Sequence, residues 1–202
     1  MPVELGPIGI WNWSFGGERE QIREVAAELE ELGYGAPWFP NRPDSFELAA
    51  DLLHATRRVA VATGIVSIWQ RPAAQAARAR QAITDAHPGR FLLGLGVSHA
   101  HLVNPGQPGR YSRPVTWMRD YLDQLDMASR SVPPAGRVLA ALGPRMPALA
   151  RDHPTGSAPL PGHSATHPAR PPGPRPRTPA RPELTVVAET DKHGPAPSPA
   201  TT

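Results

Sequence analysis

One segment near the middle of the chain constrains its fold more than any other. Residues 89–99 read Gly-Arg-Phe-Leu-Leu-Gly-Leu-Gly-Val-Ser-His, an apolar run that ends in glycine, a hydroxyl and an imidazole. A short apolar run of this kind is typical of a buried parallel strand. Its polar end predicts a ligand crevice at the carboxyl end of the strand, where α/β folds place their chemistry. Residues 59–69 repeat the pattern upstream, and an alanine-rich, helix-like stretch separates the two.

Strand and helix signals alternate over the first three quarters of the chain. Strands are predicted at residues 7–13, 36–40, 59–69, 91–97 and 138–143, and helices at 20–32, 73–86, 115–127 and 146–151, with one more beginning at a capping-box pattern of Asp44 and Glu47. Five βα units in succession predict a parallel α/β fold with right-handed crossovers. Periodicity alone does not choose between an open doubly wound sheet and a (β/α) barrel. His99 replaces the third glycine of the dinucleotide fingerprint, which disfavours a Rossmann domain.

The last quarter of the chain has a different composition. No aromatic residue follows Tyr121, and about half of the 27 prolines lie beyond Asp152. We therefore expect residues 1–152 to form the folded domain and residues 153–202 to be a disordered, proline-rich tail. The arginines of the tail stand among prolines without aromatic residues, so the net charge of +3 does not indicate a nucleic-acid interface.

Cysteine usage and hydropathy exclude several further classes. The chain has no cysteine, which rules out disulfides, thiolate catalysis and cysteine-ligated metal. Its first residues lack a basic start followed by an apolar segment, and no apolar run reaches the length of a membrane span. We expect a soluble cytoplasmic protein that binds neither membrane nor nucleic acid.

Four motifs together resemble the luciferase-like monooxygenase superfamily, and within it the actinobacterial branch of oxidoreductases that use the deazaflavin coenzyme F-420. The motifs lie at residues 61–69, 89–99, 111–123 and 137–146. The resemblance covers the first 152 residues and implies a TIM-type (β/α)8 barrel. Because only about five of the eight units are present, we expect a partial barrel, truncated or frameshifted after about residue 152.

The resemblance also implies a cofactor site at the carboxyl ends of two predicted strands. The deazaflavin would lie against Gly64, Ile65, Val66 and Ser67, with a non-prolyl cis peptide between the first two, and against Gly96, Val97, Ser98 and His99. Ser67 stands where relatives often carry Asn. A serine and an imidazole at a strand end can donate hydrogen bonds to an anion or a ring carbonyl. The alternative is that Ser98 caps the next helix and His99 is a surface loop residue.

The resemblance places three residues at the substrate pocket, and none of them is a catalytic acid or base. Trp11 and Trp13 end the first strand and either wall the pocket or pack in the bottom of the barrel. Asn41 ends the second strand where relatives often place Glu or His, and an amide cannot transfer protons at neutral pH. His99 and His101 lack a third ligand nearby, so we predict no metal site.

The resemblance implies hydride transfer between C5 of the deazaflavin and an unknown small organic substrate, by a protein whose intact relatives can be homodimers. One alternative is an FMN-dependent luciferase-like monooxygenase that consumes dioxygen. An alternative of another class is a non-catalytic fragment or a protein that recruits partners through the polyproline stretch at residues 171–176. A barrel without three of its units leaves strand edges unpaired, so we expect impaired activity, weak coenzyme binding and aggregation.

The tail itself has two interpretations. Residues 157–165, read one base later with suitable codons, give the family pattern His-Pro-Tyr-Leu-Val-Thr-Pro, and residues 182–191 again resemble the family. Residues 154–181 would then be an out-of-frame translation. The alternative is a genuine proline-rich linker or tail.

Overall fold

The computed structural model describes residues 3–6, 8–11, 18–105, 107–140, 145–153, 156–158 and 184–185. Its strands are β1 (Gly9–Trp11), β2 (Ala36–Phe39), β3 (Val61–Thr63), β4 (Val66–Ser67), β5 (Phe91–Gly96), β6 (Arg137–Ala140), β7 (Gly156–Ala158) and β8 (Leu184–Thr185). Its α-helices are α1 (Arg19–Glu31), α2 (Ser45–Ala55), α3 (Ala73–Ala86), α4 (Ala100–Val103), α5 (Pro114–Met127) and α6 (Arg145–Asp152), with 3₁₀ turns η1 (Arg110–Ser112) and η2 (Pro134–Gly136).

All strand pairings are parallel, in the order β7-β6-β5-β3-β2-β1-β8, and β4 pairs with β5 off this path. A helix lies between the two strands of every pair from β1 to β7 in this path, as parallel pairing requires, whereas β4 follows β3 directly. The predicted parallel α/β architecture is therefore confirmed. The short strands β7 and β8 lie at the two ends of the path, beyond the five predicted units, and both come from residues after Asp152.

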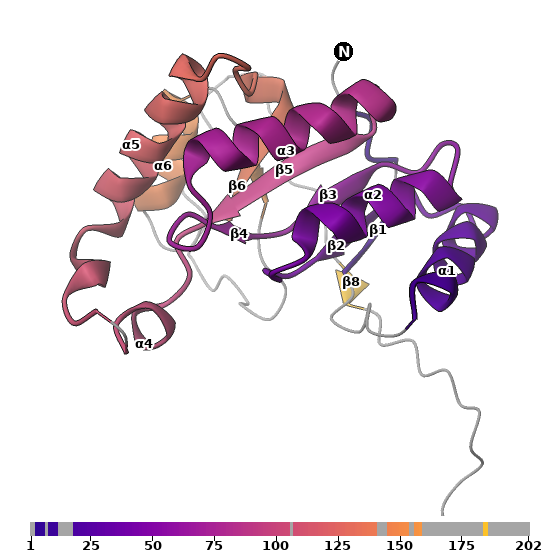
Figure 1. Cartoon of the computed structure of the whole chain (residues 1–202), viewed down its shortest axis with the longest axis horizontal. Coiled ribbons are helices and arrows are strands. Elements are labelled where there is room, and N and C mark those ends of the chain that lie inside the picture. Colours follow the sequence, from indigo (N-terminus) through magenta and orange to yellow (C-terminus); the bar gives the residue numbers. More distant parts are fainter. Residues whose placement is uncertain are drawn as a thin grey trace, which may run out of the picture.

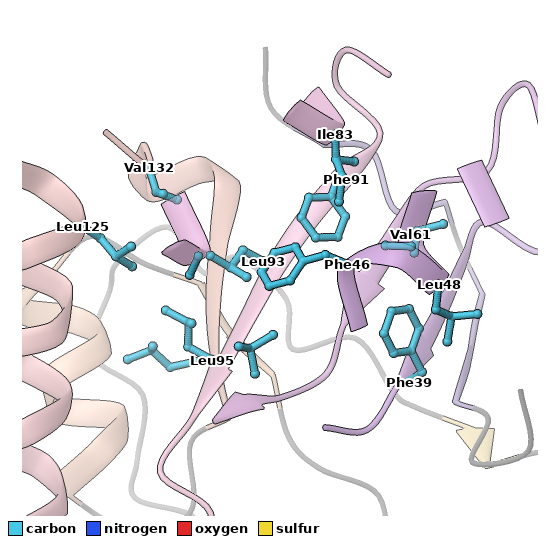
Figure 2. Packing of buried hydrophobic residues seen from close by; sticks show 14 of the residues in the cluster. Phe39, Phe46, Leu48, Val61, Ile83, Phe91, Leu93, Leu95, Leu125 and Val132 are labelled. Carbon is cyan, nitrogen blue, oxygen red and sulfur yellow. The ribbon is translucent and has the colours of Figure 1, made fainter. Parts of the chain in front are cut away.

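Successive strand residues face opposite sides of the sheet and enter two apolar clusters. Leu93 and Leu95 of β5 pack in the larger cluster, between the sheet and the helices, with Phe46, Ile83 and Leu125 from α2, α3 and α5 (Figure 2). Figure 1 shows α2 and α3 lying across this face, with α5 and α6 beside β6. The smaller cluster is on the other face of the sheet and contains Trp11, Ala36, Trp38, Ala60, Ala62, Leu92 and Val138.

The helix predictions are confirmed to within one or two residues wherever an apolar stripe supported them. The apolar residues of α5 at helical spacing, Met118, Tyr121, Leu122 and Leu125, are all buried. Gly33 follows the C-cap of α1 with a φ of 85°, the left-handed conformation that glycine adopts at a helix end.

The capping box predicted at Asp44 is wrong, although α2 begins there. The Asp44 side chain makes no capping hydrogen bond. Its carboxylate oxygens instead accept hydrogen bonds from Nε and Nη2 of Arg42, at 2.9 and 3.0 Å. The Asp44 carboxylate therefore bonds to the Arg42 guanidinium and not to the backbone N–H groups at the start of α2.

The strand predicted over residues 59–69 is in fact two strands. Gly64 donates its N–H to the carbonyl of Phe39 at 2.8 Å, which ends β3 beside β2. Two residues later β4 pairs with β5 alone. The expected cis peptide between Gly64 and Ile65 is also wrong, because every peptide bond among the described residues is trans, the form that a non-prolyl bond prefers.

Candidate functional site

The structure brings the two predicted cofactor segments together. β4 pairs with β5 so that Val66 lies opposite Leu95 and Ser67 lies opposite Gly96. Gly96 also packs against Ile65, where an added Cβ would come within 2.6 Å of the Ile65 Cγ2. The carboxyl ends of β4 and β5 therefore form one continuous surface.

Thr63 and Gly94 set the distance between β3 and β5 just below this surface. Thr63 Oγ1 donates to the carbonyl of Gly94 at 3.1 Å and accepts the Gly94 N–H at 2.8 Å. A Cβ on Gly94 would overlap the carbonyl oxygen of Thr63. Only glycine allows β3 and β5 to approach this closely, so Gly94 helps to align the strand ends above it.

Asn41 joins the end of β2 to the same surface. Its Oδ1 accepts the N–H of Ser67 at 3.0 Å, and its Nδ2 donates to Gln70 Oε1 at 2.7 Å. Both ends of the amide are thus engaged, which fixes its orientation. Asn41 thus contacts Ser67 of the predicted cofactor segment, while its predicted place in the substrate pocket stays a prediction.

The two tryptophans predicted at the first strand have different outcomes. Trp11 is 2% exposed and belongs to the smaller apolar cluster, and its ring lies where a Cβ on Gly64 would be. It is therefore a core residue that also touches a predicted cofactor position. Trp13 lies outside the described residues.

Sequence reasoning missed an aromatic cluster that holds the turn after β5. Trp69 Nε1 donates to the carbonyl of Val97 at 2.6 Å, and the Tyr111 hydroxyl donates to the carbonyl of Ser98 at 3.0 Å. The Arg110 guanidinium stacks 5.5 Å from the centre of the Trp69 ring and donates to the Trp69 carbonyl. Burial raises the pKa of Tyr111, so the hydroxyl stays protonated as a donor. The 111–123 motif contained this tyrosine, but nothing local indicated its partner.

The turn that these residues hold presents Ser98 and His99. Ser98 has a φ of 58°, a conformation that non-glycine residues rarely adopt. The N-cap of α4 is His99, which makes no side-chain capping bond, so the alternative in which Ser98 caps that helix is wrong. His99 is exposed, and its ring stacks on His101 at 5.5 Å. Among the described residues neither the Ser98 hydroxyl nor the His99 ring makes a hydrogen bond, so both donors are available to a ligand.

A pocket of about 290 Å³ opens between the end of β4 and the start of α2. Its floor is apolar and its rim carries amides and two guanidinium groups. The lining residues are Asn41, Arg42, Pro43, Ser45, Phe46, Val66, Ser67, Gln70 and Arg71. The hydrogen bond of Arg42 holds the pKa of Asp44 below its usual value, so this pair is ionised at neutral pH.

One group of possible metal ligands lies away from this surface. Asp123, Asp126 and His153 bring their ligand atoms within 4.8 Å of one another on α5 and at the end of α6. Asp126 is already paired with Arg137 Nη1 at 2.8 Å. Asp126 therefore neutralises the buried guanidinium of Arg137 on β6, and we assign no metal to the cluster.

The strands β1, β2, β3, β5 and β6 are parallel neighbours in chain order, and their crossover helices pack on one face, which is the arrangement of a TIM-type (β/α) barrel sheet. The profile of the luciferase-like monooxygenase family matches residues 7–170, and the chain belongs to this family. No match was found among curated proteins. Among the described residues, no helix combines the length and apolar character needed to cross a bilayer.

Solved structures with the same fold have low sequence identity to the chain. The coenzyme F-420-dependent tetrahydromethanopterin reductase from Methanopyrus kandleri has a TM-score of 0.53 and 14% identity, with 73% of this chain and 53% of that chain covered. The monooxygenase RslO1 from Streptomyces bottropensis has a TM-score of 0.55 and 18% identity, with 71% and 54% covered. The chain thus spans about half the length of these structures.

Proposed function

We propose that the chain is an oxidoreductase that transfers a hydride between a deazaflavin coenzyme of the F-420 type and a small organic substrate. The observation that carries the proposal is the single surface formed by residues 64–67 and 96–99. It combines apolar groups, backbone amides and two unengaged donors. Family membership and the fold shared with an F-420-dependent reductase support this choice of coenzyme.

The residues at this surface fit a flat, partly anionic coenzyme. The partly exposed Ile65 supplies apolar contact for a ring, while Ser98 and His99 supply donors for a ring carbonyl or a phosphate. When bound, the deazaflavin would supply the carbon that donates or accepts the hydride. The protein contributes orientation and electrostatics: Trp69 and Tyr111 hold the donor turn, and Thr63 and Gly94 align the strands beneath it.

Asn41 takes the place of a proton-transferring group at the end of β2. Because its amide is neutral and held at both ends, it can position a substrate but cannot exchange a proton. The substrate or water would therefore provide any proton that accompanies the hydride.

Titration of the full chain with coenzyme F-420, followed by fluorescence anisotropy, tests the proposal. We expect weak but saturable binding, and a three- to tenfold loss of affinity in Ser98→Ala and in His99→Ala. His54→Ala, at the C-terminal end of α2, is the control and should change affinity less than twofold. Binding that does not saturate, or equal losses in all three variants, would contradict the proposal.

FMN is the second candidate coenzyme, as in the FMN-dependent monooxygenase that the sequence left as an alternative. Membership of the luciferase-like monooxygenase family and the fold shared with the monooxygenase RslO1 support keeping this alternative. The same titration with FMN separates the two candidates. Tighter binding of reduced FMN, accompanied by oxygen consumption, would favour the monooxygenase. Binding of F-420 without oxygen consumption would favour hydride transfer.

A further inference from the structure

We propose that the pocket between β4 and α2 binds a small organic carboxylate, with Arg71 as its anion-binding group. This inference names the substrate class of the proposed oxidoreductase and rests on that proposal for its link to hydride transfer. The binding site itself is argued from the pocket alone. Its volume of about 290 Å³ lies at the lower end of the range for small-molecule sites.

The charge balance of the pocket favours an anion. Two arginines line it, and none of its lining residues is an aspartate or glutamate. Arg42 is neutralised by Asp44 through two hydrogen bonds. Arg71, in contrast, has no carboxylate within ion-pair distance among the described residues, and its guanidinium makes a single hydrogen bond, to the carbonyl of Pro43 at 2.9 Å. The pocket therefore holds one uncompensated positive charge.

Arg71 is also held in place before any ligand arrives. Its guanidinium carbon lies 5.2 Å from the centre of the Phe46 ring, and the Pro43 bond tethers the same group. Its backbone N–H donates to Ser67, and its carbonyl accepts from the Tyr121 hydroxyl at 2.9 Å. An immobilised guanidinium loses little side-chain entropy on binding, which favours a planar carboxylate that it can meet with two donors.

The rest of the pocket selects for an organic anion over an inorganic one. Phe46 and Val66 are buried and form an apolar floor. The paired amides of Asn41 and Gln70 lie at the rim, beside the end of β4. A ligand that places its carboxylate on Arg71 can cover the floor with its hydrocarbon part. Because Asn41 also contacts Ser67, such a ligand would lie next to the proposed cofactor surface.

Calorimetric titration of the full chain without coenzyme, with benzoate as the probe, tests the inference. Benzamide has the same shape without the charge, and inorganic phosphate has the charge without the apolar part. We expect benzoate to bind at least ten times more tightly than either. Equal affinities for benzoate and benzamide, or tighter binding of phosphate, would overturn the inference.

Two variants and a matched control locate the site. Arg71→Met keeps the apolar stem and should weaken benzoate binding at least tenfold. Gln70→Glu keeps the acceptor for Asn41 at an exposed position, adds a negative charge, and should weaken it at least fivefold. Arg130→Met is the control, because Arg130 is an exposed arginine that pairs with Asp85 and does not line the pocket. We expect less than a twofold change there.

The outcomes separate this inference from the proposed function. If Arg71→Met fails to fold, Gln70→Glu still decides the question, since its side chain lies on the exposed rim. Unchanged benzoate affinity in Gln70→Glu would overturn the inference. Benzoate binding without F-420 binding would support the carboxylate site and contradict the proposed hydride transfer. F-420 binding without benzoate binding would support the proposed function and overturn the carboxylate site.

Discussion

Gly94 is the position where a single added carbon has the clearest consequence. Its Cβ would overlap the Thr63 carbonyl oxygen and approach the Gly64 carbonyl oxygen to 2.8 Å, and neither backbone group can move without separating β3 from β5. We expect Gly94→Ala to lower the free energy of unfolding by about 3 kcal/mol or more, as overpacking of a rigid core does. Urea denaturation monitored by circular dichroism measures this loss.

Gly89→Ala provides the comparison for Gly94→Ala. Gly89 has a φ of 73°, and a Cβ added there would meet nothing within 4 Å, so only the backbone conformation is penalised. We expect a cost of about 1 kcal/mol there. If both variants lost the same amount, the close approach of β3 and β5 would not be the cause.

Arg137 is a second residue whose importance is hidden in the sequence. Its side chain is 1% exposed, and it pairs with Asp126, whose own side chain is 45% exposed. Arg80 is also buried nearby, and burial followed by the charge of Arg137 lowers the pKa of Arg80. Asp126→Asn would leave the buried Arg137 guanidinium without its carboxylate partner and beside a second buried arginine. We expect it to cost about 2 kcal/mol in thermal or urea unfolding.

Asp123→Asn tests whether Asp126 matters through its position or only through its charge. Asp123 lies one turn earlier on α5 and is 54% exposed, and its carboxylate lies 4.0 Å from Nδ1 of His153. We expect a change below about 0.5 kcal/mol. An equal loss in both variants would show that the general charge of α5, and not the pair with Arg137, supports the fold.

At the scale of elements, one carboxylate connects α1 to the turn before β3. Glu30 accepts backbone N–H groups from Arg57, Arg58 and Val59 at 2.6 to 3.1 Å. Partial burial alone would raise the pKa of Glu30, but the three backbone donors and the charge of Arg58 outweigh it, so the pKa is lowered. The carboxylate therefore stabilises the fold above its unfolded pKa, and this stability is lost as the pH falls through the lower folded value.

The Glu30→Gln variant should reproduce that loss at neutral pH. We expect it to unfold about 1 to 2 kcal/mol more easily at pH 7, because a neutral amide is a weaker acceptor for three donors. The difference from the unmodified chain should begin to shrink as the pH falls below the unfolded pKa of about 4.3, and should vanish below the lower folded pKa, where the carboxyl group is protonated in both states. A difference that stayed constant between pH 7 and pH 3 would refute the role assigned to the charge.

Local patterns predicted the helices well and the junctions between elements poorly. The apolar stripe of α5 is a property of consecutive residues, so its buried face could be predicted directly. The division of residues 59–69 depends on Phe39 and on β5, and the lost capping box depends on Arg42. The same holds at the site. The strand ends were predictable, whereas the Trp69 and Tyr111 bonds and the pocket around Arg71 need contacts between distant segments.

At the scale of the whole molecule, the residues after Asp152 take part in the sheet. β7 pairs three residues with β6, and β8 pairs two residues with β1. Deletion of residues 154–202 would leave β6 and β1 as exposed edges, which favour association between chains. Compared with the full chain, we expect the deletion variant to have a lower urea midpoint and a larger molar mass by light scattering at high protein concentration. A role of the tail in partner recruitment alone predicts that neither quantity changes.

The central claim is that the carboxyl ends of β4 and β5 form the coenzyme surface. Hydrogen–deuterium exchange of the full chain, with and without saturating coenzyme F-420, tests it most directly. The account predicts slower exchange in peptides that cover residues 64–69 and 96–101, and no change around His54 and His87, which contact each other where α2 and α3 end. Protection confined to other segments, or no protection at saturation, would contradict it.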